Sequence, residues 1–195
     1  MGIRVKLTPD ELRLAGYVGM ARFAKTVEER PKERSYDDER HRMEKQVIGA
    51  WGEYAVARYL GLSWPLTPGF GRGDIGLGAG SVARARRIGR AIEVRTTLRV
   101  GVMYLHDEDD DESAYVGVLY IPHDVFEILG WTFAREGKDK DFLQPAHSRC
   151  PRPFYEYPSD LLHSIDSLRE YFPQLYPTLC PWEYLGVRAG TGEQE

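Results

Sequence analysis

The sequence predicts a mixed α/β fold, because stretches with helical periodicity come first along the chain and β-rich runs follow them. Apolar residues recur at helical spacing over about 8–27 and again over about 44–60. Runs rich in β-branched and aromatic residues then occupy 88–97, 115–121 and 126–133. A chain of 195 residues is long enough for one domain with a substantial core.

The two predicted helices carry start and stop signals. The first, 8–27, begins at a capping box formed by Thr8 and Glu11. The second, 44–60, is followed by Gly61, a residue type that commonly ends helices. Both boundaries therefore rest on local chemistry as well as on periodicity.

The remaining segments are predicted to be mostly irregular. Residues 28–43 are almost entirely polar and are expected to form a mobile connection or lid. The Gly- and Pro-rich stretch 64–80 contains one short strand around 74–77. A single helix is expected over 159–171 in the proline-punctuated C-terminal region, and 187–195 is expected to be a disordered tail.

Glu53 lies on the second helix but off its main apolar stripe. That stripe consists of Val47, Ile48, Trp51, Ala55 and Tyr59. At 100° per residue, Glu53 falls on the opposite, smaller-residue face with Gly49, Val56 and Leu60. The pattern leaves two interpretations open, an exposed helix glutamate or a carboxylate with a function.

Charge is strongly segregated along the chain, although the net charge is only −4. That sum argues against a protein that coats nucleic acid non-specifically. Between Val82 and Val100, however, there are six arginines and one acid, Glu93. A local basic stripe of this kind is what binding to a phosphate backbone uses. The arginines are Arg84, Arg86, Arg87, Arg90, Arg95 and Arg99.

The acidic run 107–112 is expected to be a solvated loop. As an EF-hand loop starting at Asp107 it would need Gly at its sixth position and Glu at its twelfth, where the chain has Glu112 and Val118. Two other motifs are also weak. Residues 71–76 match G-x-G-x-x-G outside its required strand–helix setting. A zinc site assembled from the following residues would match no common spacing: His147, Cys150, His163 and Cys180.

The composition indicates a cytoplasmic protein without a membrane partner. No apolar run approaches the ~18 residues that a membrane span needs. The N-terminal residues lack the apolar region of a secretory signal. The chain has 2 cysteines, too few for a disulfide framework.

The strongest chemical pattern is a set of acids close to one cation. Glu93 and Arg95 fall on the same face of their predicted strand, with Cα atoms ~7 Å apart. Asp74 is expected on a neighbouring strand and Glu53 on the helix just upstream. Carboxylates beside a fixed cation suit Mg²⁺-assisted cleavage of a phosphodiester.

The order of these motifs resembles the PD-(D/E)XK nuclease superfamily, whose fold is also called restriction-endonuclease-like. The resemblance rests on a helix with Glu53, then Gly-Asp-Ile-Gly at 73–76, then Ile-Glu-Val-Arg-Thr-Thr at 92–97. It implies a central mixed β-sheet flanked by helices. The expected organisation is one domain, 1–186, with a core at about 43–135, the N-terminal helix and a Pro-rich C-terminal extension.

The resemblance also implies a set of functional residues. Glu53, Asp74, Glu93 and Arg95 would be catalytic, and Mg²⁺ or Mn²⁺ would be held by Asp74, Glu93, the Val94 carbonyl and Glu53. The implied partner is double-stranded or branched DNA, whose backbone four of the arginines would contact. They are Arg84, Arg86, Arg87 and Arg90. The oligomeric state stays open, a homodimer being one option.

Two departures from the family pattern define the alternative. Arg95 replaces the motif lysine, and an arginine with a pKa above ~12 cannot serve as a general base. Residues 98–114 leave little room for the family's second core helix. The alternative is therefore a catalytically inactive nuclease-like fold that acts as a DNA-binding or protein-interaction module.

Overall fold

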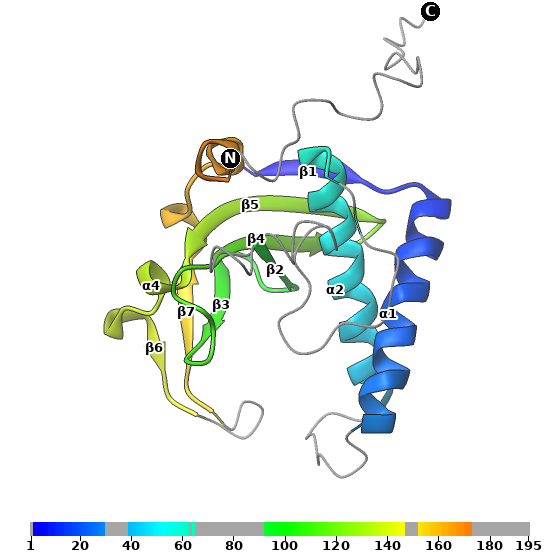
Figure 1. The fold of residues 1–195 in the computed structure, drawn as a ribbon, viewed down its shortest axis with the longest axis horizontal. Helices are drawn as coiled ribbons and strands as arrows, with labels where there is room; N and C mark the ends of the chain where they lie inside the picture. The colour runs from blue at the N-terminus through cyan, green and yellow to red at the C-terminus, as the bar shows by residue number, and fades with distance from the viewer. Residues whose placement is uncertain (1, 30–38, 63, 65–91, 147–151, 173–195) are drawn as a thin grey trace, which may run out of the picture.

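The protein is a mixed α/β structure in which helices flank a mixed four-stranded sheet (Figure 1). The computed structural model describes residues 2–29, 39–62, 64, 92–146 and 152–172. The α/β prediction is thus confirmed. The predicted strand at 74–77 and the predicted tail at 187–195 lie outside the described residues.

Helices α1 (Pro9–Glu29) and α2 (Glu39–Leu60) lie side by side (Figure 1). The expected lid at 28–43 is wrong at both ends, since its first residues belong to α1 and its last five to α2; residues 30–38 lie outside the described chain. Polar side chains support helix here through local pairing. Arg40 donates to Glu44 one turn later, at 3.0 Å, on a helix that also packs against α1.

The two helices approach closely at a glycine. A Cβ on Gly19 of α1 would lie 2.6 Å from the Cα of Val47 on α2. Nearby, the indole Nε1 of Trp51 donates a 2.8 Å hydrogen bond to the Leu12 carbonyl. The α1–α2 pair is therefore fixed by backbone contact and by a side-chain hydrogen bond. Helix α2 packs on the sheet, and α1 packs on α2.

The four-stranded sheet has the order β1–β5–β4–β2. Strands β4 (Ala114–Ile121) and β5 (Val125–Phe133) are antiparallel and confirm the predictions for 115–121 and 126–133. The predicted strand at 88–97 is confirmed over β2 (Ile92–Thr97), which pairs in parallel with β4. Strand β1 (Ile3–Lys6), antiparallel to β5, was not predicted.

A second, three-stranded sheet includes one strand from the crossover between the parallel strands β2 and β4. Its order is β3–β7–β6, with β3 at Val102–His106, β7 at Phe154–Pro158 and β6 at Leu143–Gln144. Parallel neighbours usually need a crossover helix. Here strand β3 occupies the crossover instead, so residues 98–114 hold a turn, a strand and the acidic run.

The helix expected over 159–171 is broken into short pieces. They are two 3₁₀ turns, Ser159–Leu161 and Ile165–Ser167, and α5 (Leu168–Tyr171). Between the turns, the backbone of His163 exchanges two hydrogen bonds with Trp131 of β5, at 2.8 and 3.0 Å. This strand-like pairing takes His163 out of helical geometry.

The two faces of the four-stranded sheet pack against different layers. On one face, α2 and the C-terminal segment cover a core that includes Val56, Ile92, Val116, Trp131 and Phe172. On the other face, Tyr115 packs with residues of β3 and β7, and helix α4 (Ala134–Gly137) closes this smaller core. The two faces of the sheet, and of its strand β2, thus lie in different environments: the larger core under α2 and the smaller core beside β3 and β7.

Candidate functional site

Strand β2 presents alternate side chains to those two environments. Ile92 is buried in the core beneath α2, and Val94 packs against the same core. Glu93 and Arg95 therefore leave the strand on the opposite face. The 5.1 Å separation of the Arg95 guanidinium carbon from the ring of Tyr115, a residue of the smaller core, agrees with this placement.

Helix α2 meets β2 most closely at Gly52. A Cβ on Gly52 would lie 2.0 Å from Oγ1 of Thr96, so no larger residue fits without movement. Glu53 follows directly and is only 5% exposed. The interpretation of Glu53 as an exposed helix glutamate is wrong: the smaller-residue face of α2, with Val56 and Leu60, is its buried face. Small side chains mark where this helix lies closest to the sheet.

Glu53 is charge-paired with an arginine that sequence analysis did not single out. Nη1 of Arg22, on α1, donates to both carboxylate oxygens of Glu53 at 2.9 Å. The indole Nε1 of Trp64 adds a third donor at 3.2 Å, and the Arg22 guanidinium lies over the Trp64 ring at 5.8 Å. Burial raises the pKa of Glu53, while the charge and hydrogen bond of Arg22 act in the opposite direction.

Arg95 is paired with the acidic run. Its Nη2 lies 2.5 Å from Oδ1 of Asp109, whose side chain is 6% exposed, whereas the Arg95 side chain keeps 33% exposure. Burial raises the pKa of Tyr115 strongly, and the negative charges of Asp109 and Glu93 add to this effect. The Tyr115 phenol therefore stays neutral beneath the Arg95 guanidinium. Glu93 lies close enough to Tyr115 for its charge to raise the pKa of the phenol.

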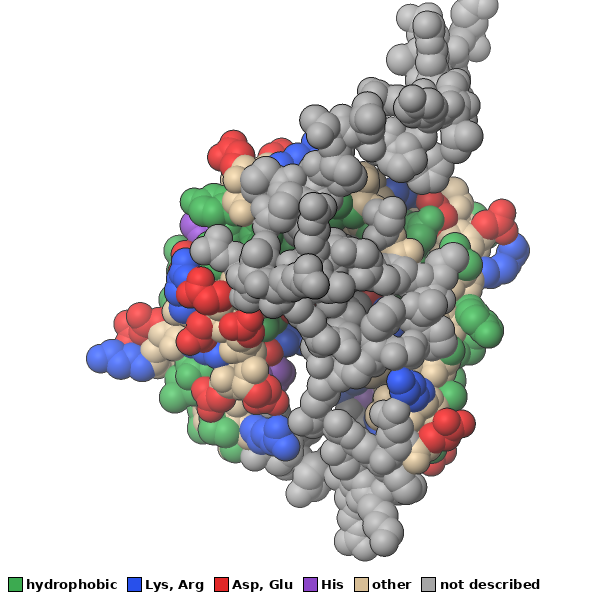
Figure 2. All heavy atoms as spheres, viewed as in Figure 1, with side chains coloured by type: hydrophobic (Ala, Val, Ile, Leu, Met, Phe, Trp, Pro, Cys, Tyr) green, Lys and Arg blue, Asp and Glu red, His purple; other side chains and the backbone are tan. Residues whose placement is uncertain are grey.

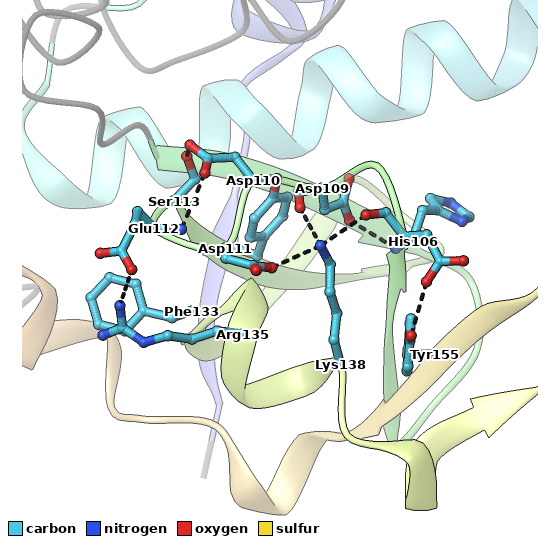
Figure 3. Close-up of polar contacts among 12 residues, drawn as sticks. His106, Asp109, Asp110, Asp111, Glu112, Ser113, Phe133, Arg135, Lys138 and Tyr155 are labelled. Carbon is cyan, nitrogen blue, oxygen red and sulfur yellow. Dashed lines mark hydrogen bonds and ion pairs between the residues drawn. The ribbon is translucent and has the colours of Figure 1, made fainter.

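The acidic run is an exposed turn, as the sequence predicted, except that Asp109 is buried. Residues 107–113, which we call the acidic turn, are organised around the ammonium of Lys138 (Figure 3). Lys138 Nζ donates to the Asp107 carbonyl at 3.0 Å, to the Asp109 carbonyl, and to Oδ1 of Asp111 at 2.8 Å. The ammonium of Lys138 thus binds backbone and side-chain oxygens that, from the sequence alone, would be expected to bond only to water.

Further bonds close the acidic turn on itself. Asp110 accepts from the Ser113 hydroxyl at 2.9 Å and from the Glu112 amide at 3.2 Å (Figure 3). The Asp110 amide in turn donates to the Tyr115 hydroxyl at 3.1 Å. In the view of Figure 2, acidic side chains gather over the region of β3 and α4, with basic side chains among them.

The oxygen donors that a metal would need are present only in part among the described residues. Glu93 and the Val94 carbonyl offer hard oxygen ligands of the kind that Mg²⁺ takes. Asp74 lies outside the described chain. Within the described residues no group of three or more His, Cys, Asp or Glu could hold a metal ion. Glu53 does not fit a direct ligand, because both its oxygens bond Arg22.

Unsatisfied polar atoms concentrate around this strand. In the part of the chain that the structure describes, the buried side-chain atoms without a hydrogen-bond partner are Arg22 Nη2, Arg95 Nε and Thr96 Oγ1. Two of these residues belong to β2, and the third pairs with Glu53. Buried polar groups are nearly always bonded, so such a concentration requires an explanation, and a ligand or an ordered water is the usual one.

The arginines that were predicted to bind the DNA backbone lie outside the described residues. So do three of the four residues considered for a zinc site. The arginines are Arg84, Arg86, Arg87 and Arg90. The fourth zinc candidate, His163, instead bonds Oε2 of Glu136 at 3.0 Å, and its ring lies 5.0 Å from the Trp131 ring at a tilt of 42°. Sequence spacing could not have shown this pairing, since His163 and Glu136 lie on separate elements.

Of the helices that the structure describes, none is long and apolar enough to cross a membrane. The chain matches no protein-family model, no curated protein and no solved structure.

Proposed function

We propose that this protein is a metal-dependent nuclease that hydrolyses phosphodiester bonds of DNA. The observation that carries the proposal is the presentation of Glu93 and Arg95 from one face of β2, next to the buried parallel strand β4. An acid and a cation on one face of the strand, with the helix that bears Glu53 over the other face, support the restriction-endonuclease-like core that the sequence resembles. The mixed sheet is compatible with that core.

The residues of this chain would divide the chemistry as follows. Asp74, Glu93 and the Val94 carbonyl would hold Mg²⁺ or Mn²⁺, which when bound supplies Lewis acidity and activates water. An arginine side chain does not act as a general base, so Arg95 would bind and stabilise phosphate instead. Glu53 would act indirectly, by keeping Arg22 neutralised beside β2.

A second candidate function is a nuclease-like fold that binds DNA or a protein without cleaving. Two specific observations favour it. Both oxygens of Glu53 are engaged by Arg22, and Arg95 is engaged by Asp109. In this alternative the arginines and acids neutralise one another, and binding depends on the remaining surface.

A cleavage assay separates the two candidates. Linear, circular and branched DNA would be incubated with Mg²⁺ or Mn²⁺, comparing wild type with Asp74→Ala and Glu93→Ala. A matched control is Asp10→Ala, which removes an acid that is 90% exposed on α1. We expect cleavage by wild type and by the control, and loss in both site variants. Cleavage that survives both substitutions would refute the nuclease, and DNA binding without cleavage would favour the second candidate.

A further inference from the structure

The acidic turn reaches β2 through one residue, Asp109. Its Oδ1 bonds Arg95, and its Oδ2 accepts a 2.9 Å hydrogen bond from the His106 backbone amide. With each oxygen held by a different donor, the carboxylate has a fixed orientation. It is also among the few buried charged side chains in the described chain.

The turn that carries Asp109 is itself anchored. Lys138 binds the carbonyls of Asp107 and Asp109 from outside the turn (Figure 3). Backbone bonds from the Asp109 amide to the His106 carbonyl and from the Ser113 amide to the Asp110 carbonyl, at 3.1 and 3.0 Å, close it from within. Asp109 is thus a rigid support, because moving it would break contacts on both sides of the turn.

Asp109 holds Arg95 but does not occupy all the hydrogen-bond donors of its guanidinium. One nitrogen bonds Asp109, the guanidinium lies over the Tyr115 ring, and a third of the side chain is exposed. A guanidinium has five N–H donors, so donors remain for a second acceptor.

We propose that Asp109 is a positioning residue that holds Arg95 over Tyr115, so that the unused donors of the guanidinium bind a phosphate of the DNA backbone. The proposal rests on the proposed function in one respect only, that DNA is the ligand. A pre-oriented guanidinium loses less freedom when it binds, and a planar fork matches a phosphate bidentately. Asp109 acts through Arg95 and need not touch DNA.

The test is a double-mutant cycle on DNA binding, which measures coupling between the two residues. A short fluorescently labelled DNA duplex would be titrated in EDTA, so that binding is separated from cleavage. The variants are Arg95→Met, Asp109→Asn and the double variant. The control is Glu108→Gln, which alters a 58% exposed acid of the same turn. Thermal unfolding would confirm that each variant is folded.

We expect Arg95→Met and Asp109→Asn each to weaken binding several-fold, and the double variant to bind no more weakly than Arg95→Met. Loss of one phosphate contact should also lower the slope of log affinity against log salt by about 0.9. Glu108→Gln should leave binding unchanged or slightly tighter. An equal effect of Asp109→Asn with and without Arg95 would overturn the proposal, because the residue would then act through the turn alone.

A further variant, Arg95→Lys, keeps the test decisive even where Asp109→Asn is unfolded. It retains the charge but loses the fork, so we expect binding weaker than wild type and tighter than Arg95→Met. Wild-type affinity in Arg95→Lys, tighter binding in Asp109→Asn, or no binding by wild type would each overturn the proposal. Failure of the nuclease assignment looks different: Asp74→Ala would leave cleavage intact while the binding cycle still showed coupling.

Discussion

The two arginine–carboxylate pairs on either side of β2 have similar partners and very different surroundings. In the Arg22–Glu53 pair both side chains are less than a tenth exposed, and α1 is joined to α2. In the Arg95–Asp109 pair the arginine keeps a third of its surface in contact with solvent. The first pair has little access to a ligand, whereas the second joins a buried support to an exposed cation.

One face of β2 thus packs under the helix that carries the buried pair, and the other face carries the partly exposed pair. A buried ion pair is costly to break, because the remaining partner is left charged in a poorly solvated site. A partly exposed arginine keeps donors available to water or to phosphate while it stays paired. Substitutions in the two pairs should therefore separate folding from binding.

The largest effect is expected at the buried pair. Arg22→Met leaves Glu53 buried without its cation, and removing one partner of such a pair typically costs about 3–5 kcal/mol. Urea unfolding would measure the loss. Arg13→Met, in a pair whose side chains are both mostly exposed, is the control and should change stability little. The double variant Arg22→Met/Glu53→Leu should recover most of the loss, and a double variant as unstable as the single one would contradict this account.

The same pair predicts a pH dependence with a definite sign. The pKa of Glu53 is raised in the folded protein, so the folded state binds its proton more tightly than the unfolded state does. The stability gained from the neutral acid is present below the ordinary pKa and is lost as pH rises through the raised value. Arg22→Met removes the main opposing influence, so its deficit relative to wild type should shrink in acid. A deficit independent of pH would show that Glu53 does not carry it.

The next largest effect on stability is expected at Gly52, where α2 contacts β2. Gly52→Ala would place a methyl 2.0 Å from Thr96 Oγ1, and overpacking of this kind costs typically about 1–3 kcal/mol. Gly49→Ala on the same helix meets nothing within 4 Å and should stabilise by roughly 0.5–1 kcal/mol. Equal effects of the two substitutions would mean that α2 does not press on β2.

How far sequence could predict this arrangement depends on how local each signal is. The strands β4 and β5 and the start of α1 were predictable, because apolar runs rich in β-forming residues and the capping box of Thr8 and Glu11 lie within a few residues. The placement of Glu53 was only half predictable. Periodicity separated it from the large apolar residues, yet the small-residue face turned out to be the buried one.

The pairings themselves were beyond local reasoning. Arg22 and Glu53 lie 31 positions apart, and Lys138 reaches Asp107 across 31 positions as well. Nothing in a run of six acids indicates that one of them, Asp109, will be buried by a lysine and an arginine from other elements. Strand β3 was missed for a related reason, since its stability comes from pairing with β7, far along the chain.

A smaller loss of stability is expected from the half-exposed pair. Asp109→Asn keeps the shape of the side chain and can still accept a hydrogen bond, while Arg95 can turn to water. We expect a loss of about 0.5–1.5 kcal/mol, the usual net contribution of one hydrogen bond. Unfolding of Asp109→Asn and of Arg22→Met in guanidinium chloride would compare the free energies of unfolding that the two pairs contribute. A loss as large as that of Arg22→Met would mean that the exposed face is no less critical to folding than the buried one.

The smallest effect is expected within the acidic turn itself, at Glu112. It pairs with Arg135 at 2.5 Å, but both side chains are close to half exposed, and pairs of this kind contribute at most about 1 kcal/mol. Glu112→Gln should change unfolding by less than about 0.5 kcal/mol and leave the binding effect of Asp109→Asn intact. The comparison matters because both residues are acids of one turn. If Glu112→Gln lowered stability as much as Asp109→Asn, the charge of the turn as a whole would hold Arg95; if it does not, the support is Asp109 alone.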